Sequence, residues 1–229
     1  IENLAIRGAD QPSLAGSVVV KDLVARSADK EIRWEPASLI VDALVEQGRG
    51  LKVQKGDFKA GFAQLTASGT ASELRADLQA DLAELYRQVS QVLDLGAMEM
   101  SGKLTGNADL KRAGENRMDF VSSMATESLQ YRADKRRLEI GKVHLASTGH
   151  LEMAGSSLRG VVMDAKADVD GKIIASGTSK SSMADKTYQA SLEVKQADLA
   201  YIGDRLKTLG VVDASASYAG NATLQVKTQ

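Results

Sequence analysis

The two histidines, His144 and His150, are the first residues of this chain that could do chemistry, because imidazole serves as a general base and as a metal ligand. They share one side of a predicted strand but lie six residues apart, with a turn expected at Gly149. A metal site needs several converging ligands that outer hydrogen bonds hold in place. We therefore predict no metal site and interpret both histidines as incidental surface or core residues.

A second candidate is a row of acidic residues on one predicted strand. Asp164, Asp168 and Asp170 alternate there with Lys166 and Lys172, all on the polar side. Carboxylates in a row could bind Ca²⁺, but calcium sites usually draw carbonyl ligands from a loop as well. The row is better interpreted as a solvated strand face.

A short basic run is the third candidate. Lys135, Arg136 and Arg137 follow Asp134 directly. Such a run is typical of the tip of a β-hairpin, and basic clusters also bind phospholipid headgroups. Both interpretations stand at this point.

No catalytic motif accompanies these residues. The chain of 229 residues has no cysteine, no Gly-x-Ser-x-Gly turn and no phosphate-binding glycine loop in the right context. We predict no enzyme activity, no catalytic residues and no cofactor. A nucleic-acid binder normally combines a basic patch with stacking aromatics. Because the net charge is −1 and the aromatic content 4%, we also predict no nucleic-acid partner.

Long strands are the elements that must position any site. Residues 98–111 are apolar or small at every second position, and Val212–Val226 repeats the pattern. Side chains alternate across a strand, so each segment has one apolar face over about fourteen residues, where globular strands average about 5–6. We predict a mainly β protein with an elongated, curved antiparallel sheet that forms a groove. The predicted lining comprises Met98, Met100, Leu104, Ala108, Leu110, Val212, Ala214, Tyr218, Leu224 and Val226.

One upstream segment shows a break in the alternation. Phe58 and Ala60 are apolar at even positions of Asp57–Thr70, but the pattern slips by one near Leu65. A β-bulge shifts the alternation in this way. We predict one bulged strand over this segment.

Two segments change to a helical period. Leu82, Leu85, Val89 and Val92 are spaced by three and four residues, which predicts an amphipathic helix over about 82–93. Asp81 is its expected N-cap, with Glu84 three residues later as in a capping box. The same spacing at Leu199, Ile202 and Leu206 predicts a second short amphipathic helix over about 197–207.

The two helical regions belong to an internal repeat. At an offset of 114 residues, Ala76–Lys111 aligns with Ala190–Gln225 without a gap, and 11 of the 36 positions are identical. The repeat predicts two groove units, 1–115 and 116–229, with one helix each. Repeats of this kind favour an elongated architecture, although a duplication inside one compact domain gives the same sequence pattern.

These motifs resemble the AsmA-like family of bacterial envelope proteins, which is related to TamB-type proteins. Asp81-Leu82-Ala83-Glu84-Leu85 matches the helix motif of that family, and Gly102–Leu110 matches the strand that follows it. The second copy, 197–199 and 216–224, is more divergent, since Ala216 replaces the first glycine and Tyr218 replaces a leucine.

The resemblance implies a sheet curled into a gutter, with phospholipid acyl chains inside and headgroups in water. It implies phospholipid transport between the inner and outer membranes, in the periplasm of a diderm bacterium and in support of outer-membrane biogenesis. No run of 18 apolar residues occurs in the chain. We therefore expect an internal fragment, anchored to the inner membrane through an N-terminal helix outside this sequence and reaching both membranes through flanking segments.

The main alternative is a structural β-repeat scaffold or spacer of an envelope or surface protein, without lipid cargo. In that case the apolar face would be sealed by the helices and an opposing sheet. The helices are short, and a helix covers only about 1.5 Å per residue. They are therefore expected to act as plugs or lids rather than as a full covering layer.

Overall fold

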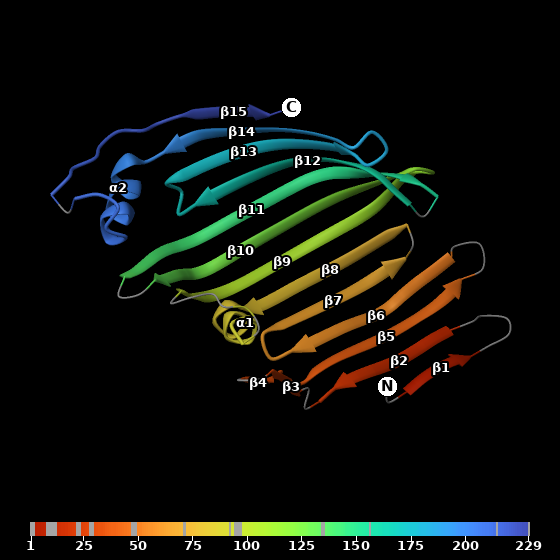
Figure 1. The fold of residues 1–229 in the computed structure, drawn as a ribbon. Helices are drawn as coiled ribbons and strands as arrows, with labels where there is room; N and C mark the ends of the chain where they lie inside the picture. Colours follow the sequence, from red (N-terminus) through yellow and green to blue (C-terminus); the bar gives the residue numbers. More distant parts are fainter. Residues whose placement is uncertain are drawn as a thin grey trace.

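The described part of the chain folds into one large open sheet with two helices and a small separate hairpin (Figure 1). The computed structural model describes residues 3–7, 13–21, 24–27, 30–46, 50–70, 72–91, 93, 98–133, 136–155, 157–213 and 215–228. The first half contains β1 (Asn3–Arg7), β2 (Ser13–Val20), β3 (Val24–Ser27), β4 (Lys30–Arg33), β5 (Ala37–Glu46), β6 (Gly50–Ala60), β7 (Ala63–Thr70), β8 (Glu73–Asp81), α1 (Leu82–Val89) and β9 (Met98–Gly114). The second half contains β10 (Arg117–Ala133), β11 (Arg136–Ala154), β12 (Ser157–Val169), β13 (Ile173–Ser182), β14 (Thr187–Ala197), α2 (Leu199–Thr208) and β15 (Leu224–Thr228).

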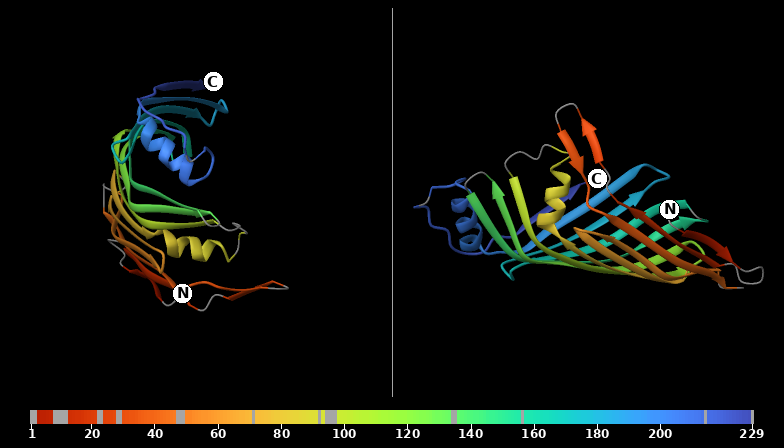
Figure 2. Two further views of the ribbon diagram at one scale, coloured as in Figure 1. Left: turned by 90° about the vertical axis from the view of Figure 1, so that its left-hand side faces the viewer. Right: turned by 90° about the horizontal axis from the view of Figure 1, so that it is seen from below.

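Strand order in the sheet follows chain order. The 13-stranded sheet runs β1-β2-β5-β6-β7-β8-β9-β10-β11-β12-β13-β14-β15, with β3 and β4 paired separately. Every neighbouring pair is antiparallel, and β1 and β15 form the two edges of the order. The sheet curls so that its cross-section is a C, with both helices on the concave side at the same end of the strands (Figure 2). The predicted fold class, a mainly β, curved antiparallel sheet with two short helices, is confirmed.

The strand register turns the alternation of the sequence into two chemically different faces, because it places apolar residues opposite apolar residues and charged residues opposite charged residues. Leu74 of β8 lies opposite Leu110 of β9 on one face. On the other face Glu73 lies opposite Lys111. Apolar and oppositely charged cross-strand pairs both stabilise a sheet, so local pattern and pairing agree.

Bulges keep the faces consistent along the longest strands. β10 and β11 have 17 and 19 residues, and their register shifts between Thr126 and Gln130. Ser128 and Gly141 adopt positive φ there, 53° and 81°. A bulge adds an extra, unpaired residue to one strand and so changes which face the side chains after it point to. Tyr131 and Leu138 therefore remain opposite each other beyond the bulge.

The first long strand is confirmed, but the bulged strand is not. The predicted strand at 98–111 is β9, which has 17 residues. Asp57–Thr70 instead contains the end of β6, a turn at residues 61 and 62, and β7. A two-residue turn shifts the alternation by one just as a bulge does. Here Ala60 and Ala63 face each other across that turn.

The second long strand, predicted over Val212–Val226, is wrong for most of its length. Only Leu224–Thr228 forms a strand, and the described residues from 211 to 223 are turns, bends and irregular chain, apart from an isolated bridge between Asn221 and Asp198. The 114-residue offset would place Ala222 opposite Ala190, but Ala190 pairs with Thr228. β9 is paired on both sides, whereas β15 is the sheet edge. A backbone segment lacking a neighbouring strand has no ladder to join.

The helices differ from the expected pair in length and register. α1 ends at Val89 rather than at residue 93, and α2 covers Leu199–Thr208. Asp81 is confirmed as the N-cap of α1, where its Oδ1 accepts from the backbone N–H groups of Ala83 and Glu84. The capping box is not closed, because the Asp81 N–H donates to the Phe62 carbonyl. The cap of α2 is Asp198, 117 residues after Asp81, so the ungapped alignment places the helices three residues out of register.

The predicted boundary between the two units, at residues 115 and 116, falls in the turn between β9 and β10. These two strands are paired along their whole length, with Met98 opposite Ala133 at one end and Gly114 opposite Arg117 at the other. The two halves therefore share one continuous hydrogen-bonded sheet.

Candidate functional site

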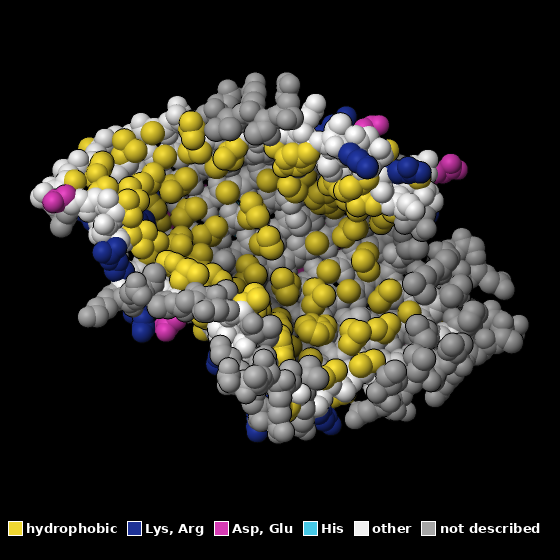
Figure 3. Space-filling view, viewed as in Figure 1, with side chains coloured by type: hydrophobic (Ala, Val, Ile, Leu, Met, Phe, Trp, Pro, Cys, Tyr) yellow, Lys and Arg dark blue, Asp and Glu magenta, His cyan; other side chains and the backbone are white. Residues whose placement is uncertain are grey.

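The concave face of the sheet carries an unbroken row of apolar residues. Register pairing connects one residue of each strand of the large sheet from β2 to β15, including Phe58, Met124 and Leu145 near the middle. Figure 3 shows this face covered by apolar side chains. The row comprises Val18, Leu39, Phe58, Leu65, Leu78, Gly106, Met124, Leu145, Ala167, Ala175, Val194 and Leu224.

A second row, in which most side chains are small, lies beside it. Each residue of this row lies two positions along its strand from a residue of the first row, about 6.6 to 6.8 Å away on the same face. Its two hydroxyls, Ser122 Oγ and Ser147 Oγ, are 2.6 Å apart and hydrogen-bond to each other. That bond lowers the cost of covering them with an apolar ligand. The row comprises Gly16, Val41, Gly56, Ala67, Ala76, Ala108, Ser122, Ser147, Ala165, Gly177 and Leu192.

Almost nothing in the described part of the chain covers this face. Only three apolar residues there are buried, Ala43, Leu82 and Ala197. Leu39 and Met124 of the apolar row are 42% and 39% exposed. The accessible surface is 15104 Å², against about 10,000 Å² expected for a compact monomer of this mass. Contiguous apolar surfaces of this kind are typical of ligand-binding grooves and of protein or membrane interaction surfaces.

The predicted lining residues of β9 share the concave face. Leu110 and Ala108 lie in register with Leu74 and Ala76. The other three are Leu104, Met100 and Met98, and of these only Met98 is largely exposed, at 41%.

The predicted lining residues after α2 are arranged differently. Leu224 ends the apolar row and is 58% exposed. Val226 lies in β15, although its side chain is outside the described residues, as is Ala214 altogether. Val212 and Tyr218 belong to no strand.

Tyr218 packs on α2 instead of continuing a strand. A Cβ placed on Gly203 of α2 would lie 2.3 Å from Tyr218 Cδ2, so the ring occupies the space that the glycine leaves. The Leu199 N–H donates to the Gly220 carbonyl over 3.0 Å, which ties the same segment to the start of α2. A glycine inside a helix was the only sequence signal for this contact.

Most of the concave face comes from strands that the sequence reasoning did not assign to the site. Phe120, Met124 and Leu145 are central to it, and none was predicted as lining. The alternation of Met118, Phe120, Ser122 and Met124 carried the signal. It was missed because these strands do not repeat the motif of β9.

Asp170 does not belong to the predicted row of acidic residues on one strand face. It lies in the turn after β12 with φ 53°, not on the polar face with Asp164 and Asp168. Tyr201 Oη of α2 lies 2.8 Å from Asp170 Oδ2 and 2.9 Å from the Ile140 carbonyl oxygen, its two acceptors. Asp170 Oδ1 accepts from the Lys142 N–H over 2.7 Å.

Arg205 completes this contact between α2 and the sheet. Its guanidinium lies 3.2 Å from the centre of the Tyr201 ring and 3.8 Å from Asp170 Oδ2. Burial and the hydrogen bond to Asp170 raise the pKa of Tyr201, so the phenol stays protonated. We refer to Asp170, Tyr201 and Arg205 as the α2 anchor.

α1 is held by a different set of contacts at the same end of the strands. Arg87 pairs with Glu84 on α1 and with Glu35, which follows β4. The hydrogen bond from Arg87 lowers the pKa of Glu84. Gln91 Oε1 accepts from the Arg33 N–H over 3.0 Å.

The two histidines lie on the outer face and do not converge. His144 Nε2 is 3.0 Å from Ser123 Oγ, and His150 Nε2 is 3.8 Å from Glu152 Oε1. In the described part of the chain, no three residues of the types His, Cys, Asp and Glu are grouped in a way that could hold a metal ion.

The N-cap of α2, Asp198, should make the stability of this helix end depend on pH. Asp198 accepts from the Tyr201 N–H over 3.0 Å and pairs with Lys172 over 3.3 Å, and these contacts lower its pKa. A carboxyl with a lowered pKa stabilises the fold above its unfolded pKa of about 3.9, and this contribution is lost as pH falls through the folded value. We expect the Tyr201 amide to lose protection from hydrogen exchange below about pH 4.

Asp198→Asn is expected to remove this pH dependence, because asparagine caps a helix without titrating. Asp213→Asn is the matched control, since Asp213 also has a lowered pKa, through Ser215, but caps no helix. Equal acid sensitivity of the Tyr201 amide in native protein and Asp198→Asn would contradict the assignment.

No protein-family model, curated protein or solved structure matches this chain. Among the described residues, no helix is long and apolar enough to cross a membrane. The geometry of the concave face is therefore the main basis for a functional assignment.

Proposed function

We propose that this chain is a periplasmic segment of an AsmA-like protein, which carries phospholipid acyl chains between the inner and outer membranes of a diderm bacterium. The observation that carries the proposal is the apolar row that crosses twelve strands and stays uncovered. The strand–helix–strand order around Asp81 and Asp198 also fits the resemblance seen in the sequence.

Acyl chains suit this surface for a simple physical reason. Each CH₂ group moved from water to an apolar surface contributes about 0.8 kcal/mol. Leu, Met, Val and Ala side chains line the face, and its serine hydroxyls at Ser122 and Ser147 are paired. A tail is therefore retained without polar recognition along its length.

The open form of the sheet also suits transport. Both helices lie at one end of the strands, so the rest of the concave face is accessible from the side (Figures 1 and 2). A headgroup can stay in water while the tails lie against the sheet. Movement along the face then requires no desolvation of the headgroup, which would cost several kcal/mol for a charged phosphate.

The test is to purify the chain without detergent from a diderm bacterium and to measure bound lipid. Native mass spectrometry should show adducts with the mass of phospholipid, and extraction should recover the same lipids. A well-folded, lipid-free protein that also fails to take up fluorescent phospholipid from vesicles would overturn the proposal. It would favour the alternative of a structural scaffold.

A further inference from the structure

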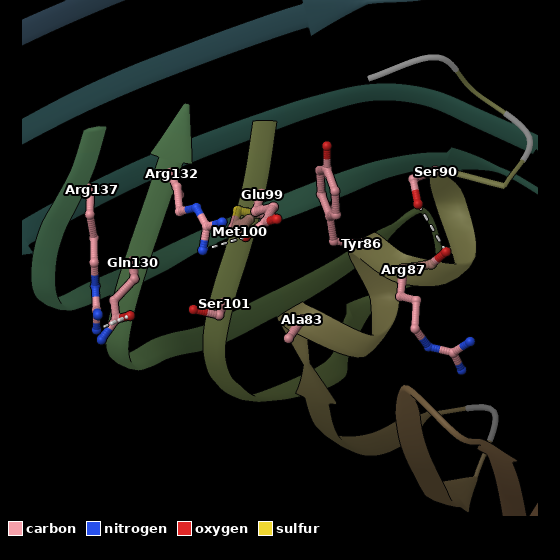
Figure 4. Close-up of a pocket in the computed structure, with 10 residues that line it drawn as sticks. All are labelled: Ala83, Tyr86, Arg87, Ser90, Glu99, Met100, Ser101, Gln130, Arg132 and Arg137. Carbon is pink, nitrogen blue, oxygen red and sulfur yellow. Dashed lines mark hydrogen bonds and ion pairs between the residues drawn. The ribbon is translucent and has the colours of Figure 1, made fainter. Parts of the chain in front are cut away.

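A cavity opens between α1 and the adjoining ends of β9, β10 and β11 (Figure 4). Its volume is about 410 Å³, within the usual range of about 300–1,000 Å³ for small-ligand sites. The residues used in the argument below are Tyr86, Met100, Ser101, Gln130, Arg132 and Arg137.

The cavity brings two arginines of neighbouring strands together. Arg132 of β10 lies directly opposite Arg137 of β11 in the register. Like charges in this position destabilise a sheet. The acidic partners are Glu99, 3.4 Å from Arg132, and Glu139, 3.3 Å from Arg137.

Both ion pairs are weak enough to exchange. The four side chains are 57% to 68% exposed, and exposed pairs contribute at most about 1 kcal/mol. The phosphodiester of a phospholipid carries one negative charge, as a carboxylate does, and its oxygens can accept bidentate hydrogen bonds from a guanidinium. Gln130, whose Oε1 accepts from Arg137 over 2.6 Å, and Ser101 add neutral hydrogen-bonding groups.

The cavity also adjoins the apolar face. Met100, which lines it, lies opposite Tyr131 in the row that continues the concave side of β9. Tyr86 lines it too, and its hydroxyl is buried without a hydrogen-bond partner in the described structure. Arg132 and Arg137 alternate with Tyr131 and Leu138, so they lie on the outer face of these strands, whereas Met100 lies on the concave face. β9 pairs with β8 only from Lys103 to Lys111. An amphiphile could therefore place an anionic group at the arginines and pass its chains around the β9 edge, past Met100, onto the concave face.

We propose that this cavity binds the phosphate of a phospholipid headgroup, with Arg132 and Arg137 as its ligands. The inference rests on the proposed function, because it takes the tails to lie on the concave face. The site contacts the phosphate that all phospholipids share, so it selects phospholipid over neutral lipid without selecting the headgroup alcohol.

The experiment measures binding of two fluorescent lipids with the same acyl chains, a phosphatidylglycerol and a diacylglycerol. The double substitution Arg132→Gln and Arg137→Gln should weaken phosphatidylglycerol binding about tenfold or more, the equivalent of one charge-assisted hydrogen bond. Diacylglycerol binding should not change. Glu99→Gln should strengthen phosphatidylglycerol binding, because it removes the competing carboxylate.

The matched control replaces Arg75 and Arg117 by glutamine. These arginines form comparable exposed pairs with Asp77 and Asp119 outside the cavity, so the control makes the same change in net charge. It should leave the affinity for both lipids unaltered.

The outcomes separate this inference from the proposed function. If both lipids bind the native chain equally and the double variant changes neither, the headgroup site is wrong and the groove stands. If neither lipid binds, the groove itself is wrong. Competition by inorganic phosphate alone at the affinity of the lipid would assign the cavity to free phosphate and overturn the headgroup assignment.

Discussion

Replacing Met124 by glutamate is expected to abolish lipid retention while the protein stays folded. Met124 lies at the centre of the apolar row, opposite Gly106 and Leu145. A Cβ on Gly106 would meet Met124 Cγ at 3.2 Å, so the methionine lies over the glycine on the concave face. A carboxylate there would be stripped of water by an acyl chain, which costs several kcal/mol.

We expect the amount of co-purified phospholipid to fall at least tenfold, since each 1.4 kcal/mol is a factor of ten. Native mass spectrometry measures the loss directly. Met124 is 39% exposed, so a carboxylate at this position remains solvated when no lipid covers it, and the thermal unfolding midpoint should change little.

Val121→Glu is the matched control, because it adds the same charge to the same strand on the opposite face. Val121 is 55% exposed and lies opposite Asp109 and Thr148. Lipid retention should be unaffected by this change. Equal loss of lipid in both variants would point to a general charge effect and against an apolar groove.

Replacing Asp170 by alanine is expected to release α2 from the sheet. The carboxylate holds the Tyr201 hydroxyl, the Lys142 N–H and the Arg205 guanidinium together. Its loss leaves the Lys142 N–H without its acceptor and a non-glycine residue at φ 53° without side-chain support. We expect a loss of roughly 2–4 kcal/mol in unfolding free energy, the sum of a lost hydrogen-bond partner and backbone strain.

Hydrogen exchange of the α2 amides, together with thermal unfolding, measures this effect. Asp170→Asn should lose less, because asparagine tolerates positive φ and keeps an acceptor oxygen. Asp164→Ala, on the outer face of β12, should stay within about 0.5 kcal/mol of the native chain. Unchanged exchange of α2 in Asp170→Ala would show that the anchor does not hold the helix.

The two predictions concern separate features of one surface. Met124 tests what the open concave face binds, whereas Asp170 tests what holds a helix at one end of it. If α2 limits access at that end, Asp170→Ala should speed lipid exchange with vesicles without reducing the amount bound. In a lipid-transfer assay, Met124→Glu should therefore lower the amount of lipid bound, whereas Asp170→Ala should raise the rate of lipid exchange.

The sequence by itself determined the features that depend on near neighbours along the chain. Alternation at 98–111 predicted β9 and its two faces, because side-chain direction in a strand is a local property. Asp81 was predicted as an N-cap for the same reason, since the cap bonds span two and three residues.

Only the tertiary structure decided how these elements pair. A slip in alternation has the same appearance for a bulge and a turn, and the pairing of Ala60 with Ala63 selected the turn. Asp170 alternates with its neighbours in sequence, but the chain turns at this residue, so its side chain meets Tyr201.

The repeat shows the same limit most clearly. Val212–Val226 carries the pattern of β9, but near residue 221 it makes only an isolated bridge, between Asn221 and Asp198, and it pairs with β14 as a strand only from Leu224 onward. Tyr218 packs instead on the space left by Gly203. Local pattern specifies which face a side chain would take, whereas contacts distant in sequence specify whether the strand exists and what covers it.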